Sequence, residues 1–190
     1  MSEENRFRRQ VLETAGALFY RAGFRAVGVD AIAAEAGVGK MTLYRHFASK
    51  DDLIAAYLAD SDARFWAWSE AALAEAAGRP REQLLSFFRA LGAQAAQPAC
   101  HGCPFLNAVV DFPEPGHPGR QIAQAHKQAV RERFQALAAQ AGAADPAALA
   151  DQLYLVMDGA WMAVRVFGAR GPARQAPAAA AALLAAHLPE

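Results

Sequence analysis

Residues 29–47, with the sequence VDAIAAEAGVGKMTLYRHF, predict two short helices joined by a glycine turn. Gly37 lies between the helices, where glycine supplies a backbone conformation with positive φ that other residues disfavour. Apolar residues recur at helical spacing on both sides of it, which predicts a shared buried face. This is the geometry of a helix-turn-helix. The predicted buried face comprises Ile32, Ala33, Ala36, Val38, Leu43 and Phe47.

The outer face of the second helix carries polar and basic side chains. Such side chains have the reach to contact base edges in the major groove and the phosphates beside it. A solvated surface helix explains the same residues, and a short helix pair alone favours that interpretation because such pairs are common. The outer residues are Lys40, Met41, Thr42, Tyr44, Arg45 and His46, with Lys50 just beyond.

A longer pattern around the helix pair distinguishes these interpretations. Gly23-Phe24 and VDAIA at residues 29–33 precede Ala36-Gly37-Val38, and TLYRHFASKDDL follows at residues 42–53. Over about residues 6–54 this pattern resembles the N-terminal signature of the tetracycline-repressor (TetR) family. Its most specific part is Leu-Tyr-x-His-Phe-x-x-Lys at residues 43–50.

The resemblance implies a homodimeric transcriptional regulator, usually a repressor, that binds double-stranded operator DNA. Such a protein is not an enzyme and needs no cofactor. A small-molecule effector, bound by a variable helical domain, would release it from DNA. The predicted DNA-binding residues match base-reading positions of the family (Lys40, Met41, Thr42) or its phosphate-contacting positions (Tyr44, His46, Lys50).

Three residues depart from the family pattern. Gly28 and Gly39 stand where the family often has the serine or threonine that caps a helix and contacts DNA. Glycine is a tolerable N-cap, so we expect both helices to form without those hydroxyl groups. Met41 replaces a frequent glycine and offers an apolar contact to a thymine methyl group.

The composition predicts an all-α protein. Alanine makes up about a quarter of the chain, whereas β-branched residues, which favour strands, are scarce. We expect an N-terminal helix-turn-helix DNA-binding domain over residues 1–50 and a helical ligand-binding and dimerisation domain over residues 51–190. Ser49 and Asp145-Pro146 have the residue types of helix starts. The expected helices cover about 6–22, 29–36, 40–47, 49–77, 81–97, 121–141, 147–167 and 178–188, with a short apolar run at 105–112 and a linker at 168–177.

Charge excludes a polycation but not a DNA-binding protein. The 19 basic and 19 acidic residues balance over the whole chain, yet residues 1–50 hold eight basic and five acidic side chains. An apolar content of 54% excludes a disordered chain. The longest uncharged apolar stretch, near 176–188, is too short to span a bilayer, and no apolar signal core follows the first residues. We therefore expect a cytoplasmic protein with no membrane partner.

Aromatic side chains recur at helical spacing after residue 50. Such stripes are more often plain core than ligand site, but the resemblance favours a pocket because domains of this family often enclose one. Polar groups among apolar ones would orient a ligand there. Asp158 and Arg165, two turns apart, could instead organise a dimer contact. The predicted ligand-binding residues are Trp66, Phe88, Phe105, Asn107, Asp111, His126, Tyr154, Asp158 and Trp161.

The motif Cys100-His101-Gly102-Cys103-Pro104 leaves several interpretations open. Two cysteines with two residues between them are compatible with a redox or electrophile sensor, or with zinc if histidines complete the site. The ordinary interpretation is the entry of a helix at Pro104, and we expect no metal. A thiol oxidoreductase is the alternative function, disfavoured because no strands are predicted around the motif. A third alternative is a DNA-bending module without a ligand.

The last two expected helices, about 147–167 and 178–188, are where the resemblance places the dimer interface. Their alanines, together with Gly159 and Ala160, allow helices to approach closely. A two-fold dimer requires a palindromic operator with two spaced half-sites.

Overall fold

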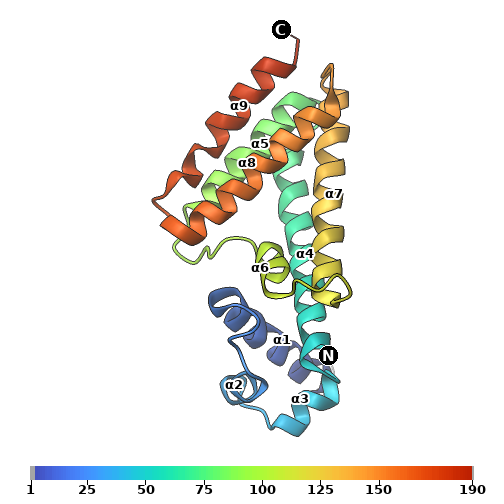
Figure 1. Ribbon diagram of the computed structural model, residues 1–190, viewed down its shortest axis with the longest axis vertical. Coiled ribbons are helices and arrows are strands. Elements are labelled where there is room, and N and C mark those ends of the chain that lie inside the picture. Colours follow the sequence, from blue (N-terminus) through green and yellow to red (C-terminus); the bar gives the residue numbers. More distant parts are fainter. Residues whose placement is uncertain (1–2, 190) are drawn as a thin grey trace. The chain divides into compact units, whose positions relative to one another are not determined.

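The computed structural model describes residues 3–189, and within that range the chain forms helices and no strand (Figure 1). The prediction of an all-α fold is confirmed. The elements are α1 (Glu3–Ala22), α2 (Val29–Glu35), α3 (Lys40–His46), α4 (Lys50–Ala74), α5 (Pro80–Ala95), α6 (Pro104–Asp111), α7 (Pro118–Gln140), α8 (Pro146–Phe167), a 3-10 turn (Pro172–Gln175) and α9 (Ala176–His187).

The helices form two compact units that do not follow the order of the chain. The first unit combines the chain up to Ala63 with Pro104–His126. The second combines Arg64–Cys103 with the chain from Lys127 onward. Helix packing therefore groups α6 and the start of α7 with the helix-turn-helix, although about forty residues separate these segments in sequence.

An aromatic cluster forms the core of the first unit. Phe19 of α1 lies 5.2 Å from Phe24 and 5.9 Å from Tyr57 of α4, measured between ring centroids. The rings are tilted against each other, the arrangement that aromatic pairs prefer, and burial of each large apolar side chain contributes about 1.5–3 kcal/mol. Ile32 of α2 and Leu43 of α3 are also fully buried, and both helices contact α1, which carries Phe19.

Asp111 ties α6 to the loop that follows α1. Its Oδ2 accepts a hydrogen bond of 2.7 Å from the backbone N–H of Phe24, and its carbonyl oxygen accepts one of 2.5 Å from Nε of Arg25. The carboxylate thus satisfies a backbone donor of a loop that has no helical partner for it. This contact joins residues 87 positions apart in sequence.

In the second unit α5, α8 and α9 contact one another, and Figure 1 shows the three helices side by side. Phe87 of α5 packs edge to face on Phe134 of α7, with centroids 5.0 Å apart. Helix α8 begins where the sequence predicts, because the Asp145 side chain accepts a hydrogen bond of 3.0 Å from the N–H of Ala148. The predicted cap at Ser49 is also confirmed, by a bond of 3.0 Å from the N–H of Asp52.

Most helix ends lie within three residues of the expected ones, but two segments that were not expected to be helical form helical structure. The apolar run at 105–112 forms α6, since proline suits the first turn of a helix and Pro104 provides it. The expected linker contains a 3-10 turn, and α9 already begins at Ala176, with Pro177 tolerated in its first turn. Among the described residues, no helix is long and apolar enough to cross a membrane.

Candidate nucleic-acid interface

The turn between α2 and α3 closes as a helix C-terminal cap. Gly37 has a φ of +62°, the left-handed region that glycine adopts without strain. The N–H of Gly37 donates to the carbonyl of Ala34 at 3.1 Å, and the N–H of Val38 donates to Ala33 at 3.0 Å. These bonds satisfy the last carbonyls of α2 and direct the chain into α3.

Glycine caps both helices of the pair without a side-chain hydrogen bond. Gly28 and Gly39 have extended backbones at the N-caps of α2 and α3. The N–H groups of Thr42 and Leu43 donate to the carbonyl of Gly39, at 2.9 and 3.1 Å. The expectation that these helices form without a capping hydroxyl is confirmed.

Helix α3 has a buried face and an exposed face. Leu43 is fully buried, and Phe47 directly after the helix is nearly so. On the exposed face, Met41 has 79% of its surface accessible to solvent, a large fraction for an apolar side chain. Lys40, Tyr44 and Arg45 are exposed with it, and Thr42 and His46 are half-buried.

Lys40 is held by an acidic side chain from the first helix of the pair. Its Nζ lies 2.8 Å from Oδ1 of Asp30 on α2. The hydrogen bond to Asp30 raises the pKa of Lys40, so its ammonium keeps its charge. Sequence reasoning placed Lys40 on the outer face but missed Asp30, although opposite charges flanking the glycine turn are a signal for such a pair.

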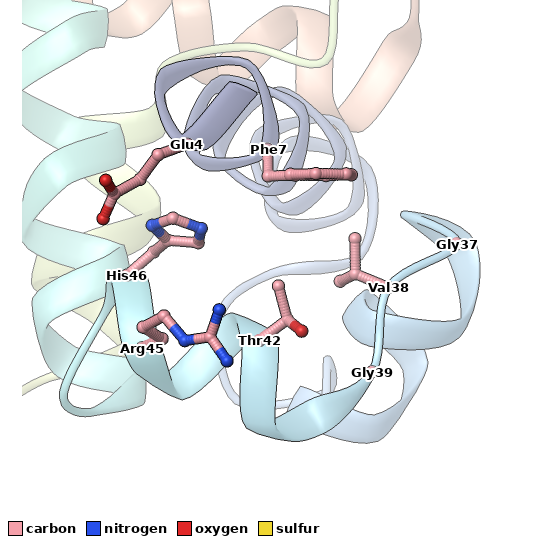
Figure 2. A pocket seen from close by; sticks show the side chains of 8 residues that line it. All are labelled: Glu4, Phe7, Gly37, Val38, Gly39, Thr42, Arg45 and His46. Atoms are coloured by element: carbon pink, nitrogen blue, oxygen red, sulfur yellow. The ribbon is translucent and has the colours of Figure 1, made fainter. Parts of the chain in front are cut away.

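A cavity of about 620 Å³ opens between the first turns of α1 and the helix-turn-helix (Figure 2). Figure 2 shows the Glu4 carboxylate beside the imidazole of His46. The cavity therefore offers hydroxyl, guanidinium and imidazole donors beside apolar surface, the mixture that a sugar-phosphate backbone contacts. Its lining comprises Glu4, Phe7, Gly37, Val38, Gly39, Thr42, Arg45 and His46.

Lys50 is anchored to the loop after α1. Its Nζ donates a hydrogen bond of 2.7 Å to the carbonyl oxygen of Phe24. Burial lowers the pKa of Lys50, since desolvation disfavours its charged form. An ammonium group has three donors, and this bond uses one of them. A phosphate contact by Lys50 remains a prediction.

Four of the nine predicted ligand-binding residues lie in the first unit. The rings of Phe105 and His126 stack with centroids 3.6 Å apart, and Nδ1 of His126 lies 2.6 Å from Oδ1 of Asp62. Nδ2 of Asn107 is buried without a hydrogen-bond partner. Asp111 is engaged with the loop after α1, as described above.

The other five lie in the second unit. Phe88 is buried in the cluster of phenylalanine rings, Trp66 packs edge to face on Phe65, and Trp161 lies 6.4 Å from Trp68 between ring centroids. Asp158 pairs with Lys127, a residue that sequence reasoning missed, and the Lys127 ammonium lies 5.7 Å from the centre of the Tyr154 ring. Burial, and then a hydrogen bond with Asp158, raise the pKa of Tyr154. Whether these residues bind a ligand remains a prediction.

The two thiols of the cysteine motif are buried. Cys100 and Cys103 lie in the second unit, and no disulfide joins them. Pro104 begins α6 directly after Cys103, as the ordinary interpretation of the motif expects. In the part of the chain that the structure describes, no three His, Cys, Asp or Glu side chains cluster closely enough to hold a metal ion.

Comparison with known families matches both parts of the chain. Residues 11–57 match the model of the bacterial regulatory proteins of the tetR family, and residues 80–180 match the tetracyclin repressor-like C-terminal domain. The crystal structure of SCO4454, a TetR-family transcriptional regulator from Streptomyces coelicolor, is 34% identical. Its TM-score is 0.91, and the match covers 96% of each chain.

Two curated relatives match over shorter stretches. The HTH-type transcriptional regulator YjdC of Escherichia coli is 29% identical over 92 residues, which are 48% of each chain. The chain thus spans about half the length of this relative. The HTH-type transcriptional activator FasR of Mycolicibacterium smegmatis is 47% identical over 51 residues, 27% of this chain and 23% of that protein. With its helix-turn-helix, its matching C-terminal domain and the full-length likeness to SCO4454, the chain belongs to the tetR family of bacterial transcriptional regulators, which bind DNA.

Proposed function

We propose that this chain is a repressor that binds a palindromic operator as a homodimer in the cytoplasm and leaves it when a small molecule binds. The observation that carries the proposal is the exposed face of α3. It presents the exposed apolar side chain of Met41 beside the cationic side chain of Lys40. Both are side chains that read base edges in the major groove.

The experiment that tests the proposal is selection of bound sequences from random double-stranded DNA. We expect enrichment of a palindrome whose half-sites lie about one helical turn, or a multiple of it, apart. The logarithm of affinity for that sequence should fall linearly with the logarithm of salt concentration, because phosphate contacts release counterions. Affinity that is independent of salt, or no enriched sequence, would contradict DNA recognition by α3.

Repression and release are tested with the selected operator placed at a promoter. Transcription in vitro should fall when the protein is added and recover with an effector that also weakens operator binding. Tyr154, Asp158 and Lys127 support an effector site in the second unit, because they bring charged groups beside an aromatic ring, and such groups can orient a ligand. An increase of transcription on adding the protein would identify an activator instead.

An exposed apolar stripe supports the homodimer. On α8, Leu155 is 68% exposed, and Met162 and Val166 lie on the same side of the helix at seven- and eleven-residue separation. Exposed apolar patches of this kind mark interaction surfaces. The exposed residues of α9 are alanines, which let a second helix approach closely. We assign these two faces to a second copy of the chain.

Replacing Leu155 with glutamate should convert the dimer to a monomer. A carboxylate buried without a partner in the interface weakens association by about a hundredfold or more. Sedimentation equilibrium measures the change. Val110→Glu is the matched control, because Val110 on α6 is equally apolar and 71% exposed but lies outside the stripe. Equal dissociation constants for the two variants would place the interface elsewhere.

A further inference from the structure

The ion pair between Lys40 and Asp30 joins α2 and α3 across the glycine turn of the helix-turn-helix. Lys40 is the first residue of α3, and a cation at a helix N-terminus is electrostatically disfavoured. Asp30 lies in the first turn of α2, and its Oδ1 is 2.8 Å from the ammonium nitrogen. The carboxylate therefore compensates for an unfavourable position of the lysine.

Stability gives little reason for this pair. The side chains of Lys40 and Asp30 are 53% and 78% exposed, and ion pairs in water contribute little to folding. The pair has a geometric consequence that does not depend on its burial. A lysine side chain is long and flexible, and a charged hydrogen bond at its end restricts where the ammonium group lies.

The restricted ammonium group has donors left for DNA. Lysine has three N–H donors, and Asp30 uses one. The acceptors O6 and N7 of guanine are the usual partners of lysine in the major groove. Without Asp30, the same ammonium would be free to reach a phosphate oxygen, a contact that carries no sequence information directly.

We propose that Asp30 is a positioning residue that directs Lys40 to guanine and away from the phosphates, beside a thymine methyl contact from Met41. The proposal rests on the proposed function, since it assumes that α3 reads an operator. It predicts that each half-site contains one G·C base pair, and that the preference of the protein for this pair requires the carboxylate of Asp30. The negative charge of Asp30 also repels phosphates, so it reduces affinity for DNA of any sequence.

The test compares sequence selection by the wild type, Asp30→Asn and Asp30→Glu. Discrimination for one G·C pair of each half-site should fall about two- to fivefold in Asp30→Asn, which is as far as an exposed ion pair can bias the position of one ammonium group. Affinity for random DNA should rise, and the slope of log affinity against log salt should steepen by up to about 1. Asp30→Glu retains a carboxylate and should retain the discrimination.

Two further variants separate positioning from charge. Glu35→Gln removes the same charge from the other end of α2, so it should leave discrimination intact. In a Lys40→Ala background, Asp30→Asn should no longer change discrimination at that pair. If the wild type enriches a palindrome and Asp30→Asn enriches it with the same base preferences, the positioning role is wrong. If the wild type enriches no sequence, the proposed function itself fails.

Discussion

Replacing Gly102 with alanine should lower the free energy of unfolding by about 3 kcal/mol. Gly102 has a φ of +90°, where a side chain is disfavoured by about 1–2 kcal/mol. The new Cβ would also lie 2.8 Å from the carbonyl oxygen of Trp161. That oxygen belongs to the backbone of α8, which cannot yield as a flexible side chain does. The loop that carries both cysteines therefore packs closely against α8 at Gly102, which has no side chain.

Urea denaturation followed by circular dichroism measures the effect. Gly116→Ala is the matched control, because Gly116 has no positive φ and a Cβ there would meet no atom within 4 Å. We expect the control to unfold at the wild-type midpoint. Equal midpoints for Gly102→Ala and the control would show that the loop shifts away from α8 at no cost.

The helix-turn-helix was predictable because its determinants are local. Gly37 defines the turn, and hydrogen bonds between residues three and five positions apart close it. The buried face follows from helical spacing, so Leu43 and Phe47 are recognisable from sequence alone. The caps at Ser49 and Asp145 lie three residues from the N–H groups they accept from. Each of these features is contained in a short window of sequence.

The grouping of helices was not predictable, because it depends on contacts between distant residues. Asp111 was a candidate ligand residue by its place among apolar neighbours, and only the fold shows its bond to Phe24. The same holds for His126, whose partner Asp62 lies 64 residues away. A polar residue in an apolar stretch has the same sequence signature whether it meets a ligand or a backbone donor. The nine candidates therefore divide between two units that the sequence pattern does not separate.

The other large expected effect concerns a buried ion pair between α7 and α8, at the line of contact that we call the seam. Lys127 and Asp158 are 10% and 16% exposed as side chains, and the ammonium group donates a hydrogen bond to the carboxylate. Burial of two charges is costly, and their attraction compensates only while both are present. Four residues along α7, Arg131 pairs with Asp151 in the same way, but both are considerably more exposed. The seam thus holds two ion pairs that differ mainly in burial.

Replacing Asp158 with alanine should lower the free energy of unfolding by about 3–5 kcal/mol, because Lys127 is left buried without its counter-charge. Replacing both partners, Lys127→Met with Asp158→Leu, should recover most of that loss, since two apolar side chains then fill the seam. Asp151→Ala, the exposed counterpart on the same helices, should cost no more than about 1 kcal/mol. Urea denaturation of the four proteins gives the comparison. Equal losses of unfolding free energy for Asp158→Ala and Asp151→Ala would mean that water reaches Lys127. If the double variant is as unstable as Asp158→Ala, the charges themselves hold the two helices in register.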